Sequence, residues 1–182
     1  MYVTPNKKFA FIAHPRTASR ATGKSLCLPH FEKTGHHNFD RELCKRITGS
    51  GGIVACTVRN PYDLVVSWFF NEHFREEGRH KPGEFIPWVL KNRLKHNQWL
   101  RMDIGVDLYH YGLPVCNHVL RYEELEKNLR HLATLTGHPY CQTAPYGVLP
   151  RDRDYRVYYN DETQEIVANH FARDFEKTGY TF

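Results

Sequence analysis

The stretch Ile53–Val58 (I-V-A-C-T-V), followed at once by Arg59–Ser67 (R-N-P-Y-D-L-V-V-S), decides the fold that the sequence predicts. Small and β-branched residues over Ile53–Val58 are typical of a buried strand. Pro61 suits the first turn of a helix, where its missing N–H is not needed, and Asp63 suits the positive end of the helix dipole. We therefore predict a strand that stops before Arg59 and a helix from Asn60 to about Phe74.

The junction between this strand and this helix is a candidate anion site. Arg59 carries a guanidinium that can grip a phosphate with two parallel hydrogen bonds. Ser67 lies two helical turns further along, so its hydroxyl reaches the same oxygens if the ligand lies along the helix. The alternative is a buried strand followed by an amphipathic helix with a surface arginine, and both interpretations stay open at this point.

Other segments extend the alternation of strands and helices. Phe9–His14 and Asn117–Arg121 are predicted strands, and residues 138 to 160 are predicted to be irregular. The predicted helices are Arg20–Leu28, Asp40–Ile47, Glu84–Leu94, His96–Met102, Glu123–Thr136 and a last helix capped by Asp161. Alternating strands and helices indicate one α/β domain, residues 1 to 182, with a parallel sheet that binds ligands at the carboxyl ends of its strands.

Bulk composition narrows the class of partner. The chain has 182 residues and a formal charge of +5, which favours an anionic ligand but is too mild to demand nucleic acid. No run of about 18 apolar residues is present, and the polar start at Met1 does not resemble a signal peptide, so we expect a cytoplasmic protein without a membrane partner. The five cysteines lack C-x-x-C spacing, so neither a disulfide framework nor a zinc site is predicted.

The loop after the first predicted strand, from His14 to Ser25, has two interpretations. Ala18–Ser25 fits a degenerate Walker A pattern, in which Lys24 would reach the phosphates and Ser25 would hold magnesium. Against this, Arg59 stands where a Walker B strand would place an aspartate for the metal. The other interpretation centres on P-R-T-A-S at Pro15–Ser19, with Arg16 as the cation on a phosphate.

Two of these segments together resemble the sulfotransferase family that uses 3′-phosphoadenosine 5′-phosphosulfate. They are P-R-T-A-S at Pro15–Ser19 and V-R-N-P-Y-D-L-V-V-S-W-F at Val58–Phe69. L-R-Y-E-E-L at Leu120–Leu125 and D-F-E-K-T-G-Y-T-F at Asp174–Phe182 resemble the carbohydrate-type branch, close to heparan sulfate 2-O-sulfotransferases. The resemblance implies a P-loop NTPase-like three-layer α/β/α fold with a central parallel sheet.

The same resemblance implies how the donor is bound. In that family the first loop binds the 5′-phosphosulfate and the R-N-P…S segment binds the 3′-phosphate. Many members have Lys where Arg16 stands and hydroxyl residues where Arg20 and Ala21 stand, so Thr17, Ser19 or Thr22 would supply the hydroxyl. The implied donor-binding residues are Arg16, Thr17, Ala18, Ser19, Arg20, Thr22, Arg59, Ser67, Arg151 and Arg153. The basic segment with Arg151 and Arg153 is equally compatible with a solvated loop.

Transfer to an alcohol needs a base for the acceptor proton, and histidine is the natural choice. The family resemblance implies a histidine between the two phosphate motifs, which here selects His37 first and His36 second, with His30 and Glu32 weaker. Arg16 would stabilise the developing negative charge, and no metal is expected. Solvated turn residues are the alternative for both histidines.

The sequence thus predicts sulfuryl transfer to an acceptor hydroxyl, with adenosine 3′,5′-bisphosphate as the product. A sugar or another small molecule is the expected acceptor, and residues 75 to 115 are expected to wall its pocket. Two alternatives remain: a P-loop kinase or NTPase that uses Gly23, Lys24 and Ser25, and a non-catalytic nucleotide- or glycan-binding domain.

Overall fold

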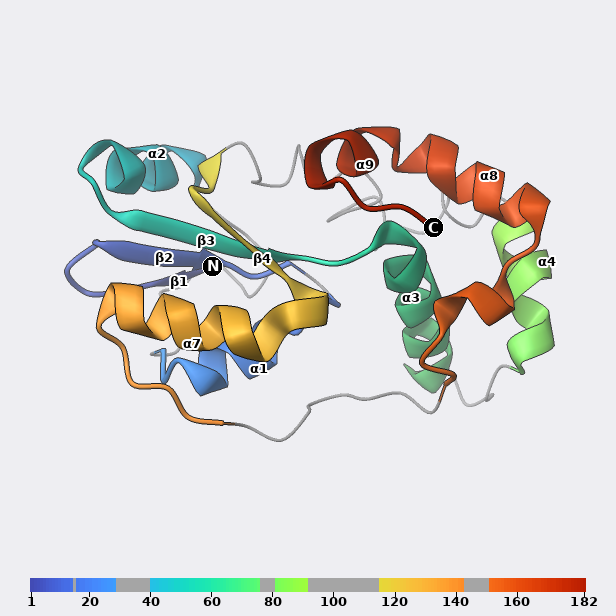
Figure 1. Ribbon diagram of the computed structural model, residues 1–182, viewed down its shortest axis with the longest axis horizontal. Helices are drawn as coiled ribbons and strands as arrows, with labels where there is room; N and C mark the ends of the chain where they lie inside the picture. The colour runs from blue at the N-terminus through green and yellow to red at the C-terminus, as the bar shows by residue number, and fades with distance from the viewer. Residues whose placement is uncertain (15, 29–39, 76–80, 92–114, 143–150) are drawn as a thin grey trace. The chain divides into compact units, whose positions relative to one another are not determined.

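A computed structural model of the chain describes residues 1–14, 16–28, 40–75, 81–91, 115–142 and 151–182 (Figure 1). The chain divides into two compact units, one formed by Met1–Arg59 with His110–Tyr146 and the other by Asn60–Tyr109 with Gly147–Phe182. Each unit has its own packing and is described by itself.

The first unit contains a four-stranded sheet in the order β1-β2-β3-β4. Its strands are β1 Tyr2–Val3, β2 Phe9–Ile12, β3 Ile53–Val58 and β4 His118–Arg121. The three predicted strands are confirmed and pair in parallel, while β1 pairs antiparallel to β2. The sequence analysis missed β1, because two residues are too short for a period-2 pattern to show.

Helices cover both faces of this sheet, so the predicted α/β architecture with a largely parallel sheet is confirmed. Helices α1 Ser19–Ser25 and α7 Leu125–Thr136 lie on one face, and α2 Arg41–Gly49 lies on the other (Figure 1). Asp40 caps α2, because its side chain accepts a hydrogen bond from the Leu43 N–H at 2.9 Å. Gly137 ends α7 in the left-handed conformation at φ 69°. The 3₁₀ turn Tyr122–Glu124 precedes α7, so that helix begins two residues later than predicted.

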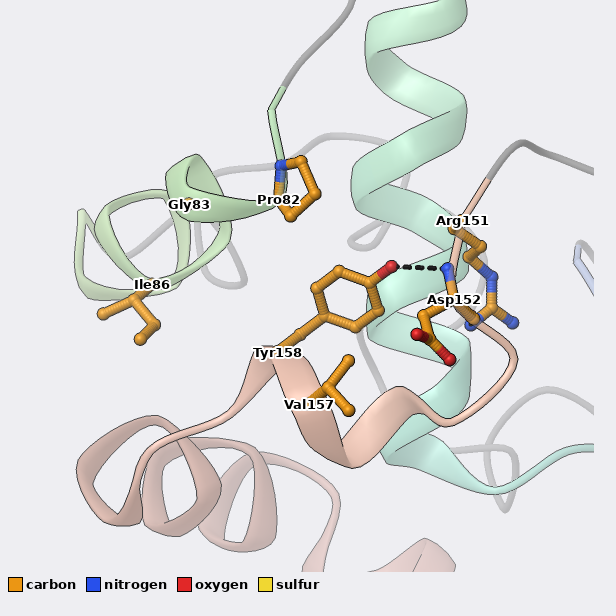
Figure 2. Close-up of a pocket in the computed structure, with 7 residues that line it drawn as sticks. All are labelled: Pro82, Gly83, Ile86, Arg151, Asp152, Val157 and Tyr158. Atoms are coloured by element: carbon orange, nitrogen blue, oxygen red, sulfur yellow. Dashed lines mark hydrogen bonds between the residues drawn. The ribbon is translucent and has the colours of Figure 1, made fainter.

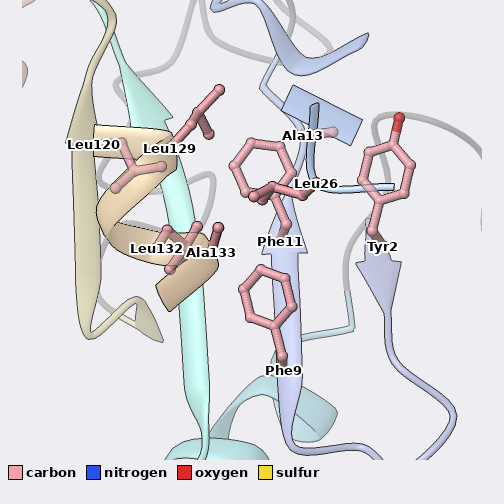
Figure 3. Packing of buried hydrophobic residues seen from close by; sticks show 10 residues of the cluster. Tyr2, Phe9, Phe11, Ala13, Leu26, Leu120, Leu129, Leu132 and Ala133 are labelled. Carbon is pink, nitrogen blue, oxygen red and sulfur yellow. The ribbon is translucent and has the colours of Figure 1, made fainter. Parts of the chain in front are cut away.

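The apolar core of the first unit lies between the sheet and the α1/α7 face (Figure 3). Phe9, Phe11 and Ala13 alternate along β2, so their side chains share this face. The other contributors are Leu26 after α1, Leu120 of β4, Tyr2 of β1, Ala55 of β3, and Leu129, Leu132 and Ala133 of α7. Burying these side chains fixes which face of each strand points inward.

The second unit is built mainly from helices. They are α3 Pro61–Arg75, the 3₁₀ turn η1 Pro82–Glu84, α4 Phe85–Leu90, the 3₁₀ turn η5 Tyr155–Tyr158, α8 Asp161–His170 and α9 Ala172–Thr178. Helix α3 agrees with the prediction, and α4 lies within the predicted helix Glu84–Leu94 but ends at Leu90. The predicted helix His96–Met102 lies outside the described residues. Segment 138 to 160 was predicted to be irregular; among its described residues, Tyr155–Tyr158 instead form η5.

The predicted cap and length of the last helix were wrong. Asn160, not Asp161, caps α8, because its side chain accepts from the Thr163 N–H at 2.9 Å and Thr163 Oγ1 accepts from the Asn160 N–H at 3.1 Å. Asp161 is instead the first helical residue, where its charge still suits the helix dipole. The helix then breaks at the buried Phe171, which separates α8 from α9.

An aromatic cluster around Tyr62 holds the second unit together. The Tyr62 ring contacts Tyr155, Tyr159, Phe175 and Phe182, with ring centroids between 4.8 and 6.3 Å apart. Tyr159 donates a hydrogen bond to the Tyr62 carbonyl at 2.9 Å, and burial raises the pKa of Tyr159 well above its usual value.

Within the described parts of the chain, no helix is both long and apolar enough to span a membrane.

Gly23 packs directly against Tyr2, and this contact yields a stability prediction. A Cβ at Gly23 would overlap the Tyr2 phenol, so Gly23→Ala should lower the free energy of unfolding by about 1–3 kcal/mol. Gly49 in α2 has open space around its Cα, so Gly49→Ala should raise stability by up to about 1 kcal/mol. Urea unfolding of both variants measures this, and a Gly23→Ala protein as stable as the parent would contradict the packing.

Candidate functional site

The loop between β2 and α1 adopts an unusual backbone conformation. Arg16 and Ala18 both lie in the left-handed region, with φ of 59° and 60°. The Thr17 side chain between them is buried, and its Oγ1 donates to the His14 carbonyl at 2.9 Å. Non-glycine residues hold such a conformation only where their surroundings enforce it, and such positions gather at ligand sites. Pro15 lies outside the described residues.

Arg59 reaches this loop from the end of β3. Its Nη1 donates a hydrogen bond to the Arg16 carbonyl at 2.9 Å, and the residue is only 5% exposed. The guanidinium carbon lies 4.1 Å from the centroid of the Tyr122 ring, a cation–π contact. The two predicted phosphate-binding segments therefore meet at the carboxyl ends of neighbouring parallel strands, as the sequence predicts.

Tyr122 is a site residue that the sequence analysis missed. Tyr122 stands in the L-R-Y-E-E-L segment that carries part of the family resemblance, and its ring lies against one face of the Arg59 guanidinium. A signal was present, because Tyr122 follows β4 directly and β4 is parallel to β3. Residues that follow neighbouring parallel strands meet at the same edge of a sheet.

The three candidate hydroxyls differ in their surroundings. The Thr17 hydroxyl donates a hydrogen bond to the His14 carbonyl. Ser19 is the first residue of α1 and is 5% exposed, at the junction of loop and helix. Thr22 is fully buried one turn later, and its Oγ1 has no hydrogen-bond partner among the residues that the structure describes. Of the three, Ser19 is the one at the start of α1, and Arg20 after it is exposed.

The geometry of α1 weighs against the Walker A interpretation. Gly23, Lys24 and Ser25 form the last turn of α1, where the Lys24 and Gly23 carbonyls accept from the Cys27 and Leu28 N–H groups. A phosphate loop needs these residues at the start of a helix, with their N–H groups facing the anion. The absence of a side chain at Gly23 is explained instead by its contact with Tyr2.

A buried cluster of polar side chains lies at the end of β2. His14 is fully buried, and both Cys56 and Cys116 interact with it or with each other. The Cys116 thiol hydrogen-bonds to Cys56 and lowers the pKa of Cys56, His14 acts in the same direction, and burial opposes both. Cys56 is buried in β3, and its pKa depends on His14, whose carbonyl accepts the hydrogen bond from Thr17.

Comparison with models of protein families and with curated proteins finds no match for the chain. What the site does must therefore be argued from its own residues. The predicted bases His37 and His36, and the weaker candidates His30 and Glu32, lie outside the described residues. The residues that the structure describes hold no group of three or more His, Cys, Asp or Glu side chains placed to bind a metal.

In the second unit, Asn60 of the R-N-P-Y-D segment organises the start of α3. Its Oδ1 accepts from the Tyr62 N–H at 3.1 Å, which caps the helix. Its Nδ2 donates to Tyr155 Oη at 2.9 Å and to the Thr181 carbonyl at 2.8 Å. Ser67, the predicted partner of the 3′-phosphate, lies further along α3 and is 2% exposed within this unit.

Arg151 makes a strong contact that the sequence did not predict. Its Nη2 lies 2.5 Å from Asp63 Oδ1, and both side chains are only 12% exposed. Arg153 by contrast is exposed. The Asp63 carboxylate therefore does more than favour the dipole of α3: it also holds the segment with Arg151 on that helix. A role for either arginine in donor binding stays a prediction.

Beside Arg151 the second unit has a pocket of about 550 Å³ (Figure 2). Its lining residues are Pro82, Gly83, Ile86, Arg151, Asp152, Val157 and Tyr158. Tyr158 Oη accepts from the Asp152 N–H at 2.7 Å, which joins the polar wall to η5. Pro82, Gly83 and Ile86 come from the segment predicted to wall the acceptor pocket, and the mix of apolar and charged walls suits a small polar organic molecule.

The Arg151–Asp63 pair gives a second prediction. Arg151→Ala should lower the free energy of unfolding by about 3 kcal/mol, because it leaves the Asp63 carboxylate buried without its cation. Arg153→Ala removes an equal charge from an exposed position and should change stability by no more than about 0.5 kcal/mol. Equal effects of the two substitutions in urea unfolding would contradict a structural role for Arg151.

Proposed function

We propose that the chain is a sulfotransferase with a P-loop NTPase-like fold, which moves a sulfuryl group from 3′-phosphoadenosine 5′-phosphosulfate to an acceptor hydroxyl. The observation that carries the proposal is the hydrogen bond from Arg59 Nη1 to the Arg16 carbonyl at 2.9 Å. It joins P-R-T-A-S and R-N-P-Y-D, the two segments whose combination resembles the sulfotransferase family. Sugars are the acceptor class suggested by that resemblance.

The residues around this contact fit a doubly phosphorylated nucleotide. Arg16 and Arg59 both follow parallel strands that end at one edge of the sheet, and the guanidinium of each residue carries donors in a planar fork that matches phosphate. The hydrogen bond to the Arg16 carbonyl and the contact with the Tyr122 ring fix the position of the Arg59 guanidinium. Arg59 is our candidate for the 3′-phosphate and the loop Arg16–Ser19 for the 5′-phosphosulfate. Ser67 is assigned to the 3′-phosphate by the sequence resemblance alone.

The donor would supply the activated sulfuryl group. Arg16 would stabilise the negative charge that develops on the transferred oxygens, as fixed cations do in phosphoryl-type transfers. Ser19 would donate a hydrogen bond at the same loop, with Thr17, Ala18, Arg20 and Thr22 as its neighbours. His37 would accept the proton of the acceptor hydroxyl, with His36 as the second candidate.

The two other classes are less well supported. A kinase or NTPase needs Gly23, Lys24 and Ser25 around a phosphate, yet these residues form the end of α1. No contact among the described residues favours that class. A non-catalytic binding domain would share the same donor site but turn over no substrate, so it differs from an enzyme in activity alone.

Nucleotide binding distinguishes the proposed sulfotransferase from the NTPase alternative. Titration calorimetry should give metal-independent binding of adenosine 3′,5′-bisphosphate that is tighter than binding of ATP with magnesium. Arg59→Ala should weaken the bisphosphate by about 10- to 100-fold, because charge-assisted hydrogen bonds contribute about 1.5–3 kcal/mol. Arg46→Ala, an exposed arginine on α2, is the matched control and should leave affinity unchanged. A preference for magnesium-ATP would overturn the proposal.

Turnover distinguishes the enzyme from the binder. With labelled donor and a panel of sugar, phenol and peptide acceptors, His37→Ala should lower kcat by about 10²- to 10⁴-fold while bisphosphate affinity stays constant. His36→Ala is the matched control on the neighbouring residue and should change kcat far less. If both variants keep full activity, the base is misassigned; if the parent binds the bisphosphate but transfers to no acceptor, the binding-domain alternative holds.

A further inference from the structure

Two exposed thiols from distant parts of the first unit meet next to α1. Cys27 Sγ and Cys141 Sγ lie 3.4 Å apart, although 114 residues separate them in the sequence. Cys27 follows α1, and Cys141 belongs to the segment after α7. Both side chains are exposed. Cysteine spacing in the sequence gave no indication of this pair.

Backbone contacts hold both cysteines in place. The Cys141 N–H donates to the Ser25 carbonyl at 2.7 Å, and the Cys27 N–H donates to the Lys24 carbonyl at 3.1 Å. Their neighbours Leu28 and Tyr140 both pack against the apolar core of the first unit. Cys27 itself sits at φ 48°, a left-handed conformation that favours glycine. The proximity of the thiols is therefore built into the backbone of this unit.

We propose that Cys27 and Cys141 are a dithiol modification site, which a low-molecular-weight disulfide such as oxidised glutathione converts to an intramolecular disulfide. The thiolate of one cysteine attacks the small disulfide, forms a mixed disulfide and releases one thiol. The thiolate of the second cysteine then attacks the protein sulfur of the mixed disulfide and releases the second thiol. The protein loses two electrons and two protons, and the small disulfide is reduced to two thiols.

Selectivity follows from exposure and distance. A disulfide needs the two sulfurs at about 2.05 Å, so the Sγ atoms must approach by little more than 1 Å, which side-chain rotation provides. Cys44 and Cys56 are buried, and Cys116 is only partly accessible. The hydrogen bond with Cys141 raises the pKa of Cys27, so the reaction should speed up as the pH rises and more thiolate forms. The bond would tie the end of α1 to the segment after α7.

The test uses the full chain, reduced and then incubated with oxidised glutathione. Mass spectrometry after alkylation should show loss of two thiols without retained glutathione, and mapping under non-reducing conditions should recover a Cys27–Cys141 peptide. Cys27→Ser and Cys141→Ser should each instead retain one glutathione on the remaining cysteine, because no second thiol can release it. Cys116→Ala is the matched control and should still form the link.

The rate of link formation provides an independent measurement. It should increase by about tenfold per pH unit below the thiol pKa, since the thiolate is the attacking species. Stable glutathione adducts on both cysteines of the parent chain would overturn the proposal. A link through Cys44, Cys56 or Cys116, or a covalent dimer through Cys27 or Cys141, would overturn it equally. These outcomes do not depend on whether the chain transfers sulfuryl groups.

Discussion

The parallel pairing of β2 with β3 is the constraint on which the candidate site depends. Its register runs from Phe9 opposite Ile53 to Ile12 opposite Cys56, and it brings the chain after each strand to the same edge. A slip of one residue would turn Phe9 and Phe11 away from the apolar cluster that they form with α7 and Leu26. The contact between Arg59 and the Arg16 carbonyl therefore depends on the apolar packing of β2 in the core of the first unit.

Much of the fold was predictable because its signals are local. The apolar run Ile53–Val58 forms β3 as expected, and α2 and α7 begin and end within two residues of the predicted helices Asp40–Ile47 and Glu123–Thr136. The partners of charged and aromatic groups were not predictable in this way. Tyr122 over Arg59, Arg151 on Asp63 and Cys27 beside Cys141 depend on segments that only the tertiary fold brings together. The short strand β1 was lost for a different reason, since two residues carry no periodicity.

The R-N-P-Y-D segment divides its side chains between two tasks. Arg59 belongs to the first unit, where it contacts the loop after β2 and the Tyr122 ring. Tyr62 and Asp63 belong to the second, where one centres the aromatic cluster and the other holds Arg151. A short motif can therefore look like a ligand site throughout while only part of it faces a ligand. The remaining residues position the elements that carry the motif.

The order of Asn60 and Pro61 has a consequence for the lifetime of the protein. Asparagine ages to aspartate when the N–H of the next residue attacks the side-chain amide, and proline has no N–H with which to do so. Conversion to aspartate would remove the Nδ2 donors that hold Tyr155 and the Thr181 carbonyl while keeping the oxygen that caps α3. Because Pro61 has no N–H, it blocks this route to aspartate at Asn60, whose amide ties the start of α3 to the Thr181 carbonyl.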